Sequence, residues 1–270
     1  MATIVTFHAH PDDEAIATGG TMARAAAEGH RVVLVLATGG EVGEVDAGFL
    51  DEGETLGERR RVETEEAARH LGVHRLEFLG YRDSGMMGEP TNDHPDCFWQ
   101  ADVDEAAERL AAILRDEDAD VLTCYDDHGG YGHPDHIQVH RVGHRAAELA
   151  GTSRLYESTM NRDHIKAMQE AAAEQGIELG GDDPEDGDGP VDVDTFGSPA
   201  EIITTAVDVT DHIDAKKAAM RAHASQITEE SFFLQLPDEA FAMAFGTEWY
   251  IRIGGTSEPD GALEPWLLDR

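Results

Sequence analysis

The chain has 270 residues, of which 40% are hydrophobic, so it can bury a sizeable core in one large domain or two small ones. Its formal net charge of −36 would repel the phosphate backbone of nucleic acid, which makes DNA and RNA poor partners. No run approaches the roughly 18 apolar residues of a membrane span, and no leader pattern precedes the first expected strand. Cys97 and Cys124 have neither metal-site nor redox spacing. We therefore expect a cytoplasmic protein that binds neither nucleic acid nor membrane.

Apolar runs alternate with helical segments over the first two thirds of the sequence. The run 32–36 is continuously apolar, which is typical of a strand buried on both faces of a parallel sheet. The alternation predicts an α/β fold with a doubly wound, mostly parallel, Rossmann-like sheet. In the strand order 3-2-1-4-5, the first and fourth strands are neighbours. The strands are expected at residues 3–8, 32–36, 75–79, 120–125 and 155–158. The helices are expected at 15–28, 54–71, 102–115 and 162–175, and a further helix should begin in the turn at 126–136 and end near residue 150.

The C-terminal third has a different pattern. Residues 178–199 are acidic and rich in Gly and Pro, which predicts a flexible loop. Strands at 202–209 and 248–253, with helices at 211–226 and 238–245, predict a small α+β extension. The expected division of the chain is a Rossmann-like catalytic core at 1–177, the acidic loop at 178–199, a strand–helix part packed on the core at 200–253, and a loosely held tail at 254–270.

The first chemically distinctive segment is His10-Pro11-Asp12-Asp13, directly after the first expected strand. The His10 imidazole and the Asp13 carboxylate are donors of the kind that hold a divalent metal ion. Asp12 lies between them and is expected to face a water molecule instead. Without a third ligand elsewhere, the segment would be read as a hydrogen-bonded turn that caps the following helix.

A second segment, His133-Pro134-Asp135-His136, repeats the pattern after the fourth expected strand. Because the carboxyl ends of neighbouring parallel strands meet at one edge of the sheet, both segments should line the crevice at the switch point. Two histidines and one carboxylate, with an open fourth position, are the ligands of a hydrolytic zinc site rather than a structural one. The expected zinc ligands are His10, Asp13 and His136.

A hydrolytic site also needs a base and groups that stabilise negative charge. Asp12 is the expected general base for a water molecule whose pKa the metal lowers. His133 and Tyr131 are expected to stabilise the oxyanion of a tetrahedral intermediate. Asp135 is a candidate to hold His133 in position and keep it protonated. For Tyr131 and Asp135, simple loop packing is nearly as good an interpretation.

Further motifs extend over most of the chain. They are Arg60-x-x-Glu63, Leu71-Gly72-Val73, Arg82-Asp83-Ser84-Gly85-Met86, Gly129-Gly130-Tyr131, Ala222-His223-Ala224-Ser225-Gln226 and Phe245-Gly246-Thr247-Glu248. Together with the two His-Pro-Asp segments, they resemble the PIG-L/LmbE family of zinc-dependent N-deacetylases, in particular its mycothiol-type deacetylase and amidase branch.

The resemblance implies the same zinc ligands, with Asp12 as general base and then acid, His133 stabilising charge and Tyr131 assisting at the oxyanion. It also implies that the family's polar substrate is contacted by Glu44, Arg60 and Asp83. Zinc is the expected cofactor, and other divalent metals remain possible because the family tolerates them.

Three functions are compatible with these observations. The first is a metal-dependent hydrolase that uses zinc-activated water to remove the acetyl group of an N-acetylated amino sugar, such as an N-acetylglucosaminyl conjugate. The second is an amidase of the same scaffold that cleaves a mycothiol-like S-conjugate amide. The third is a non-catalytic metal-binding α/β protein, which a base at Asp12 argues against. In each enzymatic case the partner is a small molecule, and the oligomeric state is open.

Overall fold

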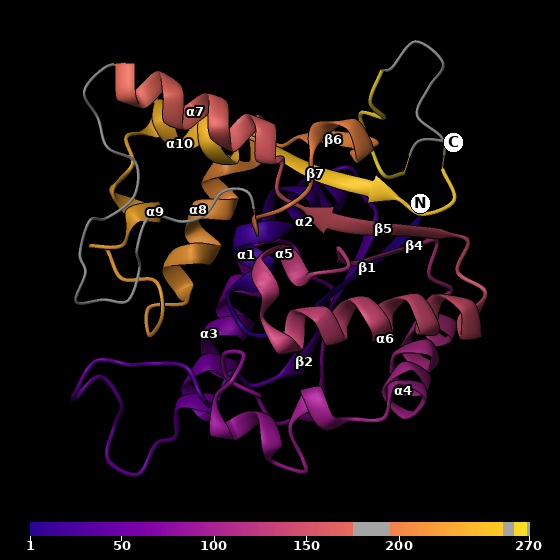
Figure 1. The fold of residues 1–270 in the computed structure, drawn as a ribbon, viewed down its shortest axis with the longest axis vertical. Coiled ribbons are helices and arrows are strands. Elements are labelled where there is room, and N and C mark those ends of the chain that lie inside the picture. The colour runs from indigo at the N-terminus through magenta and orange to yellow at the C-terminus, as the bar shows by residue number, and fades with distance from the viewer. Residues whose placement is uncertain (175–194, 256–261, 269–270) are drawn as a thin grey trace.

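A seven-stranded sheet forms the centre of the computed structural model, which describes residues 1–174, 195–255 and 262–268 (Figure 1). The strand order is β3-β2-β1-β4-β5-β7-β6. The first five strands pair in parallel, whereas β7 runs antiparallel to both β5 and β6. The predicted α/β class and the order 3-2-1-4-5 are confirmed. The strands are β1 (Thr3–His8), β2 (Arg31–Thr38), β3 (Arg75–Tyr81), β4 (Val121–Tyr125), β5 (Arg154–Thr159), β6 (Thr205–Asp208) and β7 (Thr247–Arg252).

Helices connect these strands and cover both faces of the sheet. The helix expected at 15–28 is two helices, because the backbone of Thr18 leaves the helical region with φ −136°. The helix expected at 211–226 is shorter, and a one-turn helix beyond it was missed. The helices are α1 (Asp13–Ala17), α2 (Gly19–Ala27), α3 (Leu56–His70), α4 (Val103–Asp116), α5 (Gly129–Gly132), α6 (Pro134–Ala150), α7 (Arg162–Glu174), α8 (Ile213–Ala222), α9 (Phe232–Gln235) and α10 (Asp238–Phe245).

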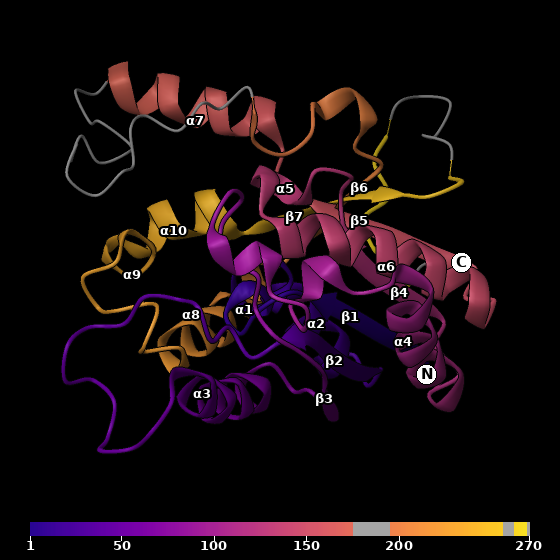
Figure 2. The ribbon, with the colours of Figure 1, turned by 60° about the horizontal axis from the view of Figure 1, so that its bottom comes forward.

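The core has two layers because side chains alternate along each buried strand. On β1, Ile4 faces one layer, in which it packs with residues of α2, α3 and α8. Val5 and Phe7 face the other layer, which α4 and α6 complete. Figure 2 shows α4 and α6 together at one side of the molecule, away from α3 and α8. Among the described residues, no helix is both long enough and apolar enough to cross a membrane.

The end of the chain returns to the core, which contradicts the loosely held tail expected at 254–270. Trp266 is 4% exposed and Leu267 is fully buried, and both belong to the layer that contains α2 and α8. Their apolar surface outweighs the Gly, Pro and acidic residues around them. Most of the acidic loop predicted at 178–199 lies outside the described residues, as do 256–261 within the tail.

A buried carboxylate joins the C-terminal extension to the core. Glu248 on β7 accepts hydrogen bonds of 2.8 Å from the backbone N–H groups of Gly20 and Thr21, in the first turn of α2. The Nζ of Lys216, on α8, pairs with the same carboxylate, and this lysine is fully buried. A negative charge at a helix N-terminus satisfies free N–H donors and is favoured by the helix dipole. The extension is therefore held on the core by a paired buried charge.

The close approach of α2 to Val209 leads to the first prediction. A Cβ atom at Gly20 would lie 2.4 Å from the Cβ of Val209, whereas a Cβ at Gly19 would have no neighbour closer than 3.4 Å. We expect Gly20→Ala to lower the free energy of unfolding by about 1–3 kcal/mol, because either α2 or the backbone at Val209 must shift to make room for the added methyl group. Gly19→Ala, the matched control, should change it by less than about 1 kcal/mol. Denaturant unfolding of both variants measures this, and equal effects would contradict the packing argument.

Candidate metal centre and active site

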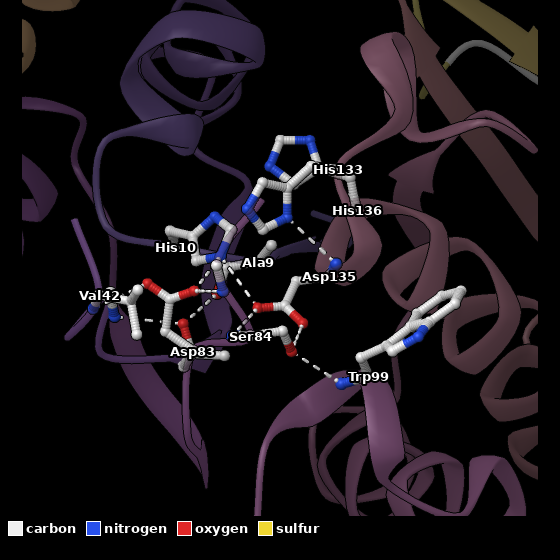
Figure 3. A network of polar contacts seen from close by, with 12 residues as sticks. Ala9, His10, Val42, Asp83, Ser84, Trp99, His133, Asp135 and His136 are labelled. Atoms are coloured by element: carbon white, nitrogen blue, oxygen red, sulfur yellow. Dashed lines mark hydrogen bonds and ion pairs between the residues drawn. The ribbon is translucent and has the colours of Figure 1, made fainter. Parts of the chain in front are cut away.

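The two His-Pro-Asp segments meet at the carboxyl edge of the sheet. Strand β1 pairs in parallel with β4, so the turn after β1 lies beside the turn that opens α6. The ring centroids of His10 and His133 are 4.6 Å apart, and those of His10 and His136 are 5.4 Å apart. Figure 3 shows the three rings gathered between the two segments. The switch-point argument thus placed side chains that are more than 120 residues apart in one cluster.

His136 has a nitrogen that is available to a metal ion. Pro134 occupies the first turn of α6, where its missing N–H costs nothing, and this fixes His136 near the start of the helix. The Nδ1 of His136 lies 3.2 Å from the carbonyl oxygen of Gly129, so it donates its proton there. Its Nε2 is buried and has no hydrogen-bond partner among the described residues. A buried lone pair without a partner fits a metal ligand whose other nitrogen is oriented by a carbonyl.

Asp13 lies between the two expected histidine ligands. One carboxylate oxygen is 3.4 Å from Nε2 of His136, and the other is 3.4 Å from Nδ1 of His10. Burial opposes ionisation, but the adjacent imidazole rings of His136 and His10 hold the pKa of Asp13 well below its usual range. The carboxylate is therefore ionised, and the donor set of two imidazoles and one carboxylate suits a divalent ion.

The opposite side of the His10 ring faces two more carboxylates (Figure 3). Its Nε2 is 3.1 Å from Asp135 and 3.5 Å from Asp83. Ser84 holds Asp135 in turn, donating its backbone N–H at 2.9 Å and its hydroxyl to the two carboxylate oxygens. Burial opposes protonation, but hydrogen bonds to Asp13, Asp135 and Asp83 raise the pKa of His10 well above its usual value. The surroundings of His10 thus have the negative charge that a bound cation would neutralise.

The prediction that Asp135 keeps His133 protonated is wrong, although Asp135 does contact the His133 ring. The backbone N–H of Asp135, not its side chain, donates to Nδ1 of His133 at 3.1 Å, while the carboxylate faces His10 and Ser84. Burial, together with the neighbouring charges of His10 and His136, lowers the pKa of His133 to about 3. His133 is therefore neutral, and since Nδ1 accepts, its Nε2 carries the proton. It is a neutral hydrogen-bond donor rather than the imidazolium that was expected.

His133 also belongs to an alternative ligand set. One ring nitrogen each from His10, His133 and His136 lie within 4.8 Å of one another, so three histidines could hold the ion without Asp13. A second group of His10, Asp83 and Asp135 meets the same limit. His10 is common to both groups.

Asp12 has a strained backbone and a perturbed carboxyl group. Its φ of 99° is a left-handed conformation that costs a non-glycine residue about 1–3 kcal/mol. Burial raises the pKa of Asp12 to about 6, although the charge of Arg60, 3.2 Å away, acts in the opposite direction. The backbone N–H of Asp12 donates to Glu14 at 3.0 Å. Glu14 in turn contacts Nε2 of His223 at 2.6 Å, and both of these side chains are fully buried.

The remaining predicted residues differ in their exposure. Tyr131 is 41% exposed, and its ring meets that of His136 edge-on, with centroids 4.9 Å apart. Glu44 is exposed on the loop after β2, where its carbonyl oxygen accepts a hydrogen bond from Gln226. Arg60 and Asp83 are only 3% and 4% exposed, so they lie beneath Asp12 and beside His10 rather than on an open surface.

Sequence reasoning missed three residues that support the site. Ser84 anchors Asp135, and the pair Glu14–His223 links the turn at Asp12 to the C-terminal extension. Each lies in or beside one of the sequence motifs, namely Arg82-Asp83-Ser84-Gly85-Met86, Ala222-His223-Ala224-Ser225-Gln226 and the segment around Asp12. The motifs pointed to these residues but gave no information on their partners.

The fold and this cluster define a doubly wound α/β protein with a candidate metal site at its switch point. The chain belongs to the PIG-L family, because residues 5–147 match the family model described as GlcNAc-PI de-N-acetylase. It is also 45% identical over 274 residues to the 1D-myo-inositol 2-acetamido-2-deoxy-alpha-D-glucopyranoside deacetylase of Acidothermus cellulolyticus, and the match covers 97% of this chain and 92% of that relative.

Solved structures share the fold at lower identity. The N,N'-diacetylchitobiose deacetylase from Pyrococcus horikoshii matches with a TM-score of 0.54 and 23% identity, covering 93% of this chain and 83% of the other. The 4-carboxy-2-hydroxymuconate hydratase GalB from Pseudomonas putida matches with a TM-score of 0.58 and 18% identity, covering 96% and 98%. Because a hydratase and a deacetylase share this fold, the fold alone does not determine the reaction.

The buried pair Glu14–His223 generates the second prediction. We expect His223→Ala to lower the free energy of unfolding by about 3–5 kcal/mol, because Glu14 is left as an unpaired buried charge. The control is His70→Ala, which removes a histidine that is 3.2 Å from Glu66 with both side chains more than 40% exposed. It should change stability by no more than about 0.5 kcal/mol. Thermal and denaturant unfolding compare the two, and a His223→Ala variant as stable as the control would disprove the pairing.

Proposed function

We propose that the protein is a zinc-dependent N-deacetylase that hydrolyses the acetamide of an N-acetylglucosaminyl conjugate. The observation that carries the proposal is the buried, unpartnered Nε2 of His136, which faces Asp13 across 3.4 Å at the crevice of the sheet. A relative that aligns with 97% of the chain is named as a deacetylase of 1D-myo-inositol 2-acetamido-2-deoxy-alpha-D-glucopyranoside, which supports this substrate class. We therefore take that molecule as the test substrate.

In this proposal the ion is held by His10, Asp13 and His136. Asp13 has an oxygen 3.4 Å from each of the two rings, so small side-chain movements would bring all three groups around one ion. Asp135 and Asp83 contact the far side of His10 and fix its orientation. When bound, a divalent ion supplies Lewis-acid polarisation of the carbonyl group and of water.

Asp12 acts as the base and then as the acid. With a pKa of about 6, its carboxylate can accept a proton from the attacking water near neutral pH and pass the proton to the leaving amine. A guanidinium nitrogen of Arg60 lies 3.2 Å from an oxygen of this carboxylate and forms an ion pair with it. The turn that presents Asp12 is fixed by its N–H bond to Glu14, so the base does not need to be ordered during the reaction.

His133 and Tyr131 stabilise the oxyanion. Because the backbone N–H of Asp135 bonds to Nδ1 of His133, the ring presents an Nε2–H donor to the site. The hydroxyl of Tyr131 stays protonated, since partial burial and the nearby carboxylate of Asp13 raise its pKa further above the usual value, and it is a second donor. Glu44, on the exposed loop, would contact the polar substrate directly. Arg60 and Asp83 are buried, so we assign them to supporting Asp12 and His10 at the floor of the site.

The reaction is tested with Asp12→Asn, which keeps the shape of the side chain but cannot accept the proton. We expect the rate of acetate release from 1D-myo-inositol 2-acetamido-2-deoxy-alpha-D-glucopyranoside to fall by about 10²- to 10⁴-fold, with zinc content unchanged. Glu89→Gln, which changes an exposed carboxylate in the connection between β3 and α4, is the control and should retain the wild-type rate. Retained turnover in Asp12→Asn would remove it from the mechanism. If wild type instead cleaves only a bulkier S-conjugate amide, the amidase alternative is correct.

The ligand set is tested by comparing two neighbouring histidines. His136→Ala should lower the zinc bound per chain by one ion relative to wild type, because it removes a ligand. His133→Ala should leave the zinc count unchanged and reduce acetate release, because in this proposal it donates a hydrogen bond only. Metal analysis after dialysis gives both counts. Loss of an ion in His133→Ala would favour the alternative set His10, His133 and His136.

A further inference from the structure

A second group of metal-binding side chains lies away from the site described above. His140 and His144 follow His136 on α6 at intervals of four residues, so the three histidines form one stripe along the helix. Glu157, on the neighbouring strand β5, faces the two later members of the stripe. Figure 1 shows α6 running alongside β5. Neither the proposed deacetylation nor the ligand set of His136 uses these three residues.

The donor atoms of this group converge on one point. The Glu157 oxygen is 2.7 Å from Nε2 of His144 and 3.2 Å from Nδ1 of His140, and the two rings lie 4.2 Å apart. One donor atom from each of the three side chains lies within 4.8 Å of the others. Around a tetrahedral zinc ion with bonds of about 2.0–2.1 Å, ligand atoms are about 3.3 Å apart. The two histidines are partly exposed, so their rings have room to rotate toward that spacing.

A simple ion pair uses only part of the donor capacity of this arrangement. Both rings approach the same carboxylate oxygen, so charging both would place two imidazolium groups 4.2 Å apart. With only one ring charged, the other retains a nitrogen lone pair. A divalent cation accepts lone pairs from both rings and balances the carboxylate.

The group is also open to ions from solution. The side chains of His140 and His144 are 20% and 31% exposed, whereas Glu157 is 10% exposed. The exposed carboxylate of Asp127 adds negative charge near His140. On a chain with a net charge of −36, the surrounding potential concentrates divalent cations rather than repelling them.

We propose that His140, His144 and Glu157 form a second divalent-cation site, of the zinc type, that is separate from the catalytic cluster. The donor set of two imidazoles and one carboxylate fits zinc or a similar transition-metal ion better than calcium or magnesium, which prefer oxygen ligands. Because the ligands come from α6 and β5, a bound ion cross-links the helix to the sheet. Binding therefore stabilises the folded chain by mass action.

The experiment counts zinc ions on the intact chain. Wild type and variants are stripped with a chelator, titrated with Zn²⁺ and freed of excess metal before zinc analysis. His144→Ala should bind one ion fewer per chain than wild type, and Zn²⁺ should raise its melting temperature by less. His70→Ala, the helical histidine paired with Glu66 at 3.2 Å, is the matched control and should bind as many ions as wild type. The test uses only the difference in zinc content between each variant and wild type, so zinc bound at the catalytic cluster does not affect the result.

Glu157→Gln provides a second variant that preserves side-chain shape and should lose the same ion. His144→Ala and Glu157→Gln combined should lose one ion in total, not two, since both contribute to one site. A wild-type zinc count in His144→Ala, or an equal loss in His70→Ala, would overturn the proposal. These counts do not depend on catalysis, so they hold whether or not acetate release is observed.

Discussion

Parallel pairing of β1 with β4 is the constraint on which the site depends. The register matches Ile4 with Val121 and Thr6 with Thr123, so both strands end at the same edge and their His-Pro-Asp turns face each other. A slip of one residue would turn the buried side chains of β1 toward the opposite layer of the core. Because each layer is filled by a different set of helices, the core fixes the register. The geometry of the candidate metal cluster is therefore set by hydrophobic packing several residues away.

The site concentrates ionisable groups that are costly to bury without partners. Each of them has a compensating contact: Asp13 lies beside two histidines, Asp135 accepts from Ser84, and Glu14 is paired with His223. Three buried nitrogens of this network have no hydrogen bond in the described part of the chain: Nε2 of His136, Nε of Arg60 and Nδ1 of His223. Of these three, Nε2 of His136 lies beside Asp13 among the expected ligands, where a bound ion would supply the missing partner.

The sequence predicted the fold and the position of the cluster because both follow from local patterns. Apolar runs and helical segments specified a parallel sheet, and the two similar turns specified its functional edge. Pairings between distant side chains were not readable in this way. His223 lies 209 residues from Glu14, and no periodicity shows that they touch. Asp135 was assigned to His133, its neighbour in sequence, but the start of α6 directs its carboxylate toward His10. The tail was misjudged because Trp266 and Leu267 are few among polar residues, yet they bury completely or nearly so.

Since a hydratase shares this fold, the chemistry must depend on how individual residues are held within it. Asp12 illustrates how the whole chain contributes. Its left-handed backbone would relax in an isolated turn, but its N–H is bound by Glu14, and Glu14 is bound by His223 of the C-terminal extension. The extension is itself fastened to α2 through Glu248. Residues at opposite ends of the sequence thus maintain the strained turn, and the same burial raises the pKa of Asp12 to about 6. A carboxyl group that is costly for folding is thereby kept in the ionisation range that the proposed proton transfer near neutral pH requires.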